Sequence, residues 1–195
     1  EVSAGSDKGY YASNTLAGTR INSKLEDLGA SISVVTKQQM QDFAMLDMND
    51  VFLYEANTEG TGNYTDFVVD RNGNVIDNVA GDPNNANRVR GIGAANTARG
   101  NFQTSGRVPM DPINTDAVEI SRGPNSNIFG LGNASGTVNI LPSQANVTRE
   151  STTVEFRADS YGSTRASLDF NRPLLKGKLA VRGSYVHQED EFIRQ

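Results

Sequence analysis

Residues 116–140 read DAVEISRGPNSNIFGLGNASGTVNI, and this stretch predicts the centre of the fold. It begins with alternating apolar and polar residues from Ala117 to Ser121, a pattern typical of a β-strand. It ends with a second predicted strand, from Thr137 to Leu141. The connection between them has glycines at positions 123, 130, 132 and 136. A strand, a glycine-bearing connection and a second strand form a compact packing unit.

The composition limits the size of the core and excludes several classes of function. The 195 residues are enough for one or two domains, but only 36% of them are hydrophobic. The net charge of −5 argues against general nucleic-acid binding, because a basic surface is needed to neutralise phosphates. There are no cysteines, which excludes disulfides, zinc–thiolate sites and thiol nucleophiles.

The two ends of the sequence indicate a fragment. Glu1 is not followed by the charged and apolar segments of a signal peptide, and the chain stops abruptly at Gln195. We therefore expect a trimmed piece of a longer protein. Residues 1–20 are small and polar, with few apolar anchors, and predict an extended, mobile arm.

The next part of the chain predicts a strand and two short helices with short links, which form an α/β packing unit. A strand is expected over Ile32–Thr36, and Thr36 can cap the helix that follows. A second short helix is expected after Asp47. Another strand is expected over Arg88–Ile92.

Two polar loops interrupt this domain. Segment 57–87 is rich in glycine, asparagine and aspartate and is predicted to contain a hairpin over 67–76. It is long for a loop inside a compact domain, which predicts that it is either functional or an insertion. The second polar loop covers residues 93–106.

Residues 146–195 have a different character. Apolar residues such as Val154 and Phe156 alternate with charged residues such as Glu155 and Arg157. The same alternation is found in the segments 152–161, 164–171 and 178–188. Transmembrane β-strands show this pattern, with apolar side chains toward lipid and polar ones toward the lumen. A soluble antiparallel sheet with one wet face shows it as well, and alternation alone does not separate the two.

The ordered set of motifs resembles the plug domain and first barrel strands of TonB-dependent outer-membrane receptors. The resemblance covers the chain from about Gly18 to Glu191 and includes an Arg-Gly box at Val89–Ile92. Its most specific signature is an acidic strand, Arg-Gly-Pro, a serine, an aromatic–glycine pair and a glycine-rich run into Val-Asn-Ile. In this chain the signature comprises Val118–Ile120, Arg122–Pro124, Ser126, Phe129–Gly130, Gly132, Gly136 and Val138–Ile140.

This resemblance implies the fold class and the domain organisation. An α+β plug, made of a small mixed sheet with short helices, is expected to precede the first antiparallel strands of a large transmembrane β-barrel. The implied regions are a mobile periplasmic arm over 1–20, a plug domain over 21–145 and the truncated start of the barrel over 146–195.

The resemblance also implies roles for charged residues. Arg90 and Arg122 are expected to face the barrel wall and pair with acidic residues there, and Glu119 belongs to the same predicted ion-pairing set. Arginine suits this role because its guanidinium stays charged and binds a carboxylate through two parallel hydrogen bonds. The alternative is that each arginine pairs inside the plug, with Glu119 as a candidate partner.

The glycine-rich signature is expected to form turns, and the loop tips are expected to bind the ligand. Backbone turns are assigned to Gly91, Gly123, Pro124, Gly130, Gly132 and Gly136. The ligand is expected at the outward tips of the plug, in segments 57–87 and 93–106. Within the second segment the candidates are Arg99, Asn101, Phe102 and Gln103, since an aromatic among amides suits a sugar or a polar metal chelate. A solvated loop without a ligand role is the alternative.

The implied function is active transport across a Gram-negative outer membrane, with the plug and the N-terminus on the periplasmic side. The receptor would import a scarce large ligand, with a ferric siderophore as the first candidate and an oligosaccharide or cobalamin as the others. Expected partners are a TonB-type periplasmic energy transducer, which binds the N-terminal arm by strand addition, outer-membrane lipid and the small-molecule ligand. The alternative function is a secreted β-rich adhesion or binding module.

Enzyme function is not expected. His187 is the single histidine, which excludes a histidine-cluster metal site and argues against a Ser–His–Asp triad. Residues Gly91–Asn96 match only part of the dinucleotide-binding fingerprint. Residues Asp70–Asn74 are not followed by the glycine and glutamate of a calcium loop. No metal or cofactor is therefore expected.

Overall fold

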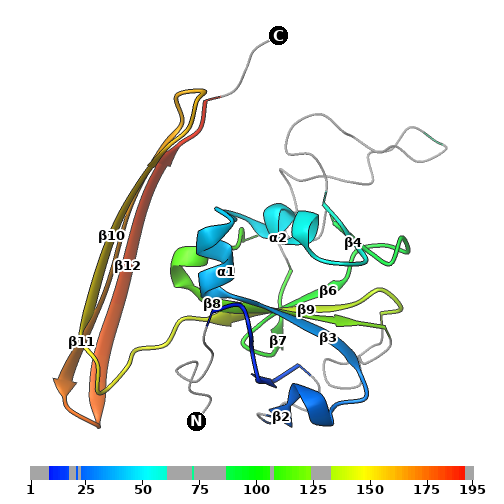
Figure 1. Ribbon diagram of the computed structural model, residues 1–195, viewed down its shortest axis with the longest axis horizontal. Helices are drawn as coiled ribbons and strands as arrows, with labels where there is room; N and C mark the ends of the chain where they lie inside the picture. The colour runs from blue at the N-terminus through cyan, green and yellow to red at the C-terminus, as the bar shows by residue number, and fades with distance from the viewer. Residues whose placement is uncertain are drawn as a thin grey trace. The chain divides into compact units, whose positions relative to one another are not determined.

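The computed structural model describes residues 9–17, 21, 23–60, 72, 87–105, 108–123 and 133–191 of the chain. The chain divides into two compact units, Glu1–Pro142 and Ser143–Gln195 (Figure 1). Among the described residues, no helix is both long enough and apolar enough to cross a membrane. The hairpin predicted over 67–76 and most of the insertion 57–87 lie outside the described residues.

The first unit is built on a five-stranded mixed sheet. The strand order is β3-β8-β9-β6-β7, in which β6 runs parallel to β9 and the other neighbours are antiparallel. The strands are β3 (Ser31–Thr36), β6 (Asn96–Arg99), β7 (Phe102–Gln103), β8 (Thr115–Arg122) and β9 (Gly136–Pro142). The strand pair predicted from residues 116–140 is confirmed, and β8 and β9 lie at the centre of the sheet.

Two helices cover one face of this sheet (Figure 1). The Thr36 side chain accepts a hydrogen bond from the Gln39 backbone and caps α1 (Lys37–Asp42), as predicted. Asp47 caps α2 (Met48–Tyr54), and Asp50 completes a reciprocal capping box. The buried apolar core between helices and sheet comprises Val35, Met40, Met45, Met48, Val51, Phe52, Val89, Ala95, Met110, Val118, Ile120, Val138 and Ile140. We call this side of the sheet the helix face.

Short elements complete the first unit. Two-stranded ribbons are formed by β1 (Asn14–Thr15) with β2 (Ser23–Lys24), and by β4 (Thr58–Glu59) with β5 (Arg88–Val89). The 3-10 helices are η1 (Leu25–Asp27) and η2 (Pro112–Asn114). The strand predicted over Arg88–Ile92 ends at Val89, because Arg90 and Gly91 adopt left-handed backbone angles with φ of 60° and 67°.

The opposite side of the sheet is polar and buried. Its side chains include Glu119 and Ser121 of β8 and Thr137 and Asn139 of β9, which are all at most 3% exposed. We call this side the polar face. Residues 9–17, the N-terminal segment, pack here through Thr15, which is 2% exposed. The mobile arm expected over residues 1–20 stays a prediction, and within it Thr15 and the Leu16 N–H donate hydrogen bonds to Glu119.

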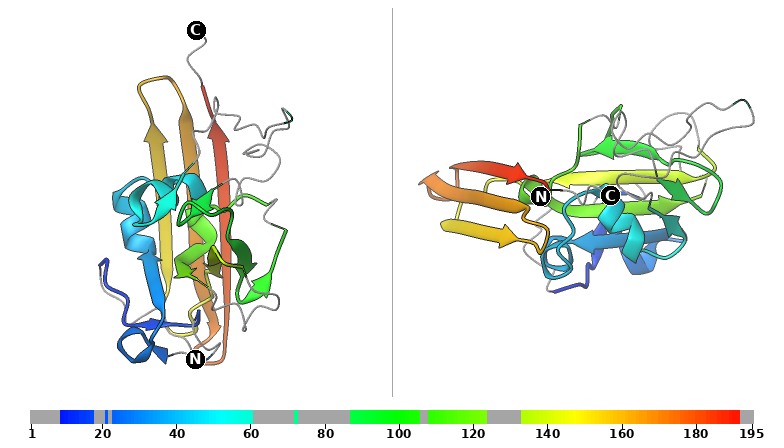
Figure 2. Two further views of the ribbon diagram at one scale, coloured as in Figure 1. Left: turned by 90° about the vertical axis from the view of Figure 1, so that its right-hand side faces the viewer. Right: turned by 90° about the horizontal axis from the view of Figure 1, so that it is seen from above.

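The second unit is an antiparallel three-stranded ribbon (Figure 2). It comprises β10 (Ser151–Ala158), β11 (Thr164–Leu175) and β12 (Leu179–Glu189). Hydrogen bonds from Ser163 close the first turn and hold the pKa of Asp159 below its usual range. The predicted strands are confirmed, except that β11 continues through Pro173, with a register shift between Pro173 and Leu175.

The two faces of this ribbon differ in chemistry. One face carries exposed apolar side chains, which include Val154, Phe156, Leu168, Phe170, Val181 and Tyr185. The other face carries Arg182, whose guanidinium binds both carboxylate oxygens of Asp169 at 3.1 and 2.8 Å. On the apolar face, an added Cβ at Gly183 would lie 2.7 Å from the Phe170 ring. Glycine therefore lets the Phe170 ring lie flat across the neighbouring strand.

Gly136 is predicted to be essential for the central strand pair. Its φ is 115°, and an added Cβ would lie 2.1 Å from the Ser121 carbonyl oxygen. Gly136→Ala is expected to lower the free energy of unfolding of the plug by about 3 kcal/mol or more, since backbone strain and overpacking add. Amide hydrogen exchange of β8 and β9 measures this change.

Gly29→Ala is the matched control. An added Cβ at Gly29 meets no atom within 4 Å. The control is expected to change the unfolding free energy by less than about 1 kcal/mol. Equal effects of the two substitutions would contradict the close approach of β8 to β9.

Candidate functional site

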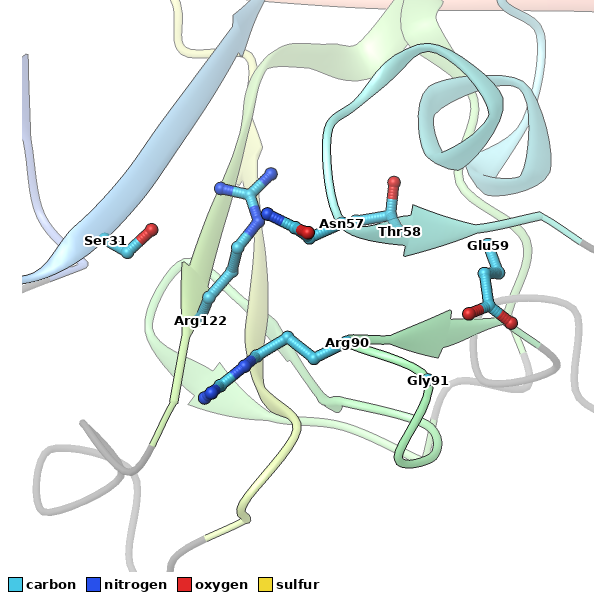
Figure 3. A pocket seen from close by; sticks show the side chains of 7 residues that line it. All are labelled: Ser31, Asn57, Thr58, Glu59, Arg90, Gly91 and Arg122. Atoms are coloured by element: carbon cyan, nitrogen blue, oxygen red, sulfur yellow. The ribbon is translucent and has the colours of Figure 1, made fainter.

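A polar pocket lies on the helix face, at the end of β8. It has a volume of about 670 Å³. Its lining, shown in Figure 3, comprises Ser31, Asn57, Thr58, Glu59, Arg90, Gly91 and Arg122. We call it the arginine pocket, because the side chains of both predicted arginines meet there although 32 positions separate them in the sequence.

Arg122 is held inside the plug by three different acceptors. Its Nε donates to the Ala56 carbonyl oxygen at 3.0 Å, and Nη1 donates to the Ser33 hydroxyl. Its Nη2 forms an ion pair with Glu55 Oε2 at 3.2 Å. The side chains of Arg122 and Glu55 are only 8% and 15% exposed. The alternative of pairing inside the plug therefore describes Arg122 in this structure, with Glu55 rather than Glu119 as its partner.

Among the described residues, Arg90 is held through its backbone alone. Its N–H donates to the Asn57 carbonyl oxygen at 2.9 Å, and its left-handed φ turns the chain at the end of β5. The guanidinium lies beside Gly123 and makes no hydrogen bond or ion pair within the described part of the chain. The pocket thus holds one compensated guanidinium and one that remains available for an external acceptor. Pairing of either arginine with a barrel wall stays a prediction.

Glu119 does not line this pocket, and its predicted place in the plug–barrel ion-pairing set stays a prediction. Successive side chains of a strand point to opposite faces, so Glu119 lies on the polar face while Arg122 lies on the helix face. Glu119 is 1% exposed and accepts hydrogen bonds from Thr15 Oγ1 at 2.6 Å and from the Leu16 N–H at 2.8 Å. Asn139 Nδ2 donates to its second oxygen at 2.8 Å.

The predicted ligand residues lie at the opposite end of the sheet. Arg99, Asn101, Phe102 and Gln103 form the β6–β7 hairpin, in which Arg99 pairs with Ile140 near the end of β9. The arginine pocket lies at the other end, where Arg122 pairs with Gly136.

Within the hairpin, the Asn101 side chain is bonded to Asn139, whereas the Phe102 ring is 79% exposed. Arg99 Nη2 donates to Asn114 Oδ1 at 3.2 Å. The hairpin and the pocket are therefore separate places, and the ligand role of the four residues stays a prediction.

The glycines assigned to turns have left-handed backbone angles wherever they are described. Gly91, Gly123 and Gly136 have φ of 67°, 98° and 115°. Pro124, Gly130 and Gly132 lie outside the described residues. The predicted role in turns is therefore not tested for these three of the six residues.

Sequence reasoning missed Glu55, Ser33 and Thr15. Glu55 is the residue after α2, and no motif or spacing distinguishes it from the other carboxylates of the chain. Ser33 could have been found from the register of β3 and β8, because it pairs with Ile120 and so lies on the same face as Arg122. Thr15 carried no signal, because it lies in a segment of small polar residues.

Comparison with known families decides the identity of this fold. A model of the TonB-dependent receptor plug domain matches residues 24–137. The chain belongs to the TonB-dependent receptor plug family. The match covers both helices, the arginine pocket and the strands β3, β6, β7 and β8, and it ends two residues into β9. The family consists of transport receptors, which confirms that the chain is not an enzyme.

Two curated relatives from Pseudomonas aeruginosa are similar over nearly the whole chain. The ferripyoverdine receptor is 28% identical over 94% of this chain and 22% of its own length. The metal-pseudopaline receptor CntO is 29% identical over 100% of this chain and 26% of its own length. The chain therefore spans about a quarter of the length of these relatives.

Solved structures share the fold. The FpvA receptor of P. aeruginosa bound to a ferric pyoverdine superposes with a TM-score of 0.75, at 22% identity, over 96% of this chain and 23% of that one. The alcaligin outer-membrane receptor FauA of Bordetella pertussis gives a TM-score of 0.74, at 20% identity, over 92% and 30%. These likenesses confirm the predicted α+β plug followed by early barrel strands.

The two arginines are predicted to differ in their contribution to stability. Lysine cannot reach the three acceptors of Arg122, so Arg122→Lys leaves a part-buried carboxylate and a carbonyl short of donors. We expect a loss of about 1–3 kcal/mol in the unfolding free energy of the plug. Arg90→Lys is the matched control and should cost less than about 0.5 kcal/mol. Denaturant titration followed by amide exchange of β3 and β8 measures both, and similar losses would contradict the described bonding of Arg122.

Proposed function

We propose that the chain is the plug and first barrel strands of an outer-membrane receptor that imports a metal chelate with energy from a TonB-type transducer. Membership of the plug family supports the architecture. The named relatives are receptors for ferripyoverdine and for metal-pseudopaline, which supports a metal chelate as the cargo. A ferric siderophore is the first candidate, ahead of an oligosaccharide or cobalamin. Membership of the plug family argues against the alternative function of a secreted adhesion or binding module.

The observation that carries this proposal is the joint presence of the plug fold and an amphipathic ribbon in one chain. Exposed aromatic and aliphatic side chains line one face of β10–β12, which suits contact with lipid. The other face carries the Arg182–Asp169 pair at 18% and 16% side-chain exposure, which suits a wet lumen. Outer-membrane lipid is the partner that the apolar face fits.

Within this proposal, Arg90 binds a carboxylate of the barrel wall. The support is local: its guanidinium lies in an open polar pocket and has no partner within the described residues. Arg122 shapes the same pocket but is already occupied by Glu55. The contact with the barrel wall would thus be made mainly by Arg90, because the charge of Arg122 is already paired with Glu55. The N-terminus would face the periplasm, where the transducer binds residues upstream of the N-terminal segment.

Charge reversal tests the contact of Arg90 with the wall. Arg90→Glu in the full-length receptor is expected to lower uptake about tenfold, as for loss of a desolvated charge pair. A reciprocal Glu→Arg or Asp→Arg change at the correct barrel position should restore most of the uptake. Uptake is measured with radioactive iron, and Arg90→Lys serves as the charge-conserving control. Failure of every barrel reversal to restore uptake would remove the wall contact from the proposal.

Uptake of defined chelates tests the function itself. Cells that lack their other receptors would express the full-length protein and be given pyoverdine-type, hydroxamate and catecholate chelates loaded with radioactive iron. Accumulation of at least one chelate, abolished when the transducer is deleted, is the expected result. Uptake that is independent of the transducer, or accumulation of none of these chelates while an oligosaccharide or cobalamin is imported, would overturn the corresponding part of the proposal.

A further inference from the structure

The N-terminal segment is joined to the sheet by a buried clasp. Glu119 is the acceptor: one of its carboxylate oxygens accepts hydrogen bonds from both the Thr15 hydroxyl and the Leu16 N–H. The Thr15 hydroxyl also accepts a hydrogen bond from the Ala17 N–H at 3.0 Å, which folds residues 15–17 around the carboxylate. Ala17 is 1% exposed. Hydrogen bonds to a carboxylate belong to the stronger class of hydrogen bond.

A second, weaker attachment lies nearer the N-terminus. The Gly9 carbonyl oxygen accepts from Thr36 Oγ1 at 2.8 Å, and the Tyr10 hydroxyl donates to Asp42 Oδ2 at 2.9 Å. The Tyr10 ring lies 5.8 Å from the ring of Phe43. Solvent reaches this attachment, because Tyr10 is 50% exposed. Exposed contacts open at a lower free-energy cost than buried ones, so a pull on the N-terminus reaches the Glu119 clasp second.

The clasp is continuous with the polar face of the sheet. The second oxygen of Glu119 binds Asn139 Nδ2, and the same Asn139 amide group donates to Asn101 Oδ1 at 2.9 Å. Asn139 Oδ1 in turn accepts from the Asn101 N–H at 2.9 Å. One network therefore joins the N-terminal segment to β8, to β9 and to the β6–β7 hairpin.

We propose that the Thr15–Glu119 clasp transmits a pull on the N-terminal segment to the central strands of the plug. The inference rests on the proposed function, because the pull comes from the transducer. When Thr15 and Leu16 are withdrawn, Asn139 is the one donor to Glu119 that remains among the described residues. A buried carboxylate that has lost its donors is costly, so water must enter the polar face. Glu119 is thus a positioning residue, and opening begins between the N-terminal segment and β8.

The first test uses hydrogen exchange in the full-length receptor in nanodiscs. Thr15→Val removes the hydroxyl and keeps the shape of the side chain, whereas Thr15→Ser keeps the hydroxyl. Exchange of the Leu16 and Ala17 amides is expected to rise about tenfold in Thr15→Val and to stay near the native rate in Thr15→Ser. Ser23→Ala is the matched control, because Ser23 lies opposite Thr15 in the β1–β2 ribbon. Equal exchange in Thr15→Val and Ser23→Ala would overturn the clasp.

The second test separates transmission of force from structure. Thr15→Val is expected to reduce the maximal rate of chelate uptake about fivefold while the chelate affinity stays within about twofold of the native value. The Thr15→Ser variant should restore uptake. Native uptake by Thr15→Val, with its Leu16 amide deprotected, would overturn the inference and leave the proposed function standing. Absence of transducer-dependent uptake in the native receptor would instead overturn the proposed function, and the exchange test would still decide the clasp.

Glu119→Gln is a second variant that tests the clasp if Thr15→Val fails to fold. The amide keeps a neutral oxygen for Thr15 and Leu16 but presents an N–H₂ group to the Asn139 donor, so the clasp is weakened rather than removed. Amide exchange at Leu16 and maximal uptake should then lie between native and Thr15→Val values. Protection of the β3 amides reports the folded plug independently. A folded Glu119→Gln receptor with native exchange at Leu16 would contradict the role of the carboxylate.

Discussion

The two-residue period of β8 is the constraint on which the rest of the plug depends. Val118 and Ile120 enter the core beneath the helices, and Arg122 continues along the same face into the arginine pocket. Glu119 points to the other face and receives the N-terminal segment. A slip of one residue would exchange the two faces, and pairing with β3 on one side and β9 on the other prevents it. One strand therefore supplies the core, the cationic pocket and the attachment of the N-terminus.

The two buried charges of β8 are satisfied in different ways. Arg122 is neutralised by an opposite charge, Glu55, while Glu119 is held by neutral donors alone among the described residues. Buried charges are weak sources of net stability but strongly disfavour any arrangement that leaves them without partners. A sheet with an apolar helix face and a hydrogen-bonded polar face is thus fixed in register, yet its polar side can exchange protein donors for water. That combination suits the proposed function, in which the plug is ordered at rest and opens inside a water-filled barrel.

Local patterns were sufficient to predict much of the fold, but not the network of its charged groups. Alternation in residues 116–140 predicted the central pair β8–β9, and Thr36 and Asp47 marked the two helix starts. The pocket was half predicted, since Arg90 and Arg122 lie in recognisable motifs whereas Glu55 lies in none. Composition suggested a mobile arm because residues 1–20 are small and polar. It could not show that Thr15 forms a hydrogen bond with a carboxylate 104 positions away.

The contrast between the arginines also has a backbone origin. Arg122 is an extended residue at the end of a long central strand, so its side chain is directed by the sheet toward fixed acceptors. Arg90 follows a two-residue strand and has a φ of 60°, which costs a non-glycine residue about 1 kcal/mol or more. Nothing that its guanidinium contacts among the described residues offsets that cost. The backbone strain at Arg90 is easier to explain if its guanidinium binds a partner. The proposed carboxylate of the barrel wall would provide an interaction that offsets the free energy of that strain.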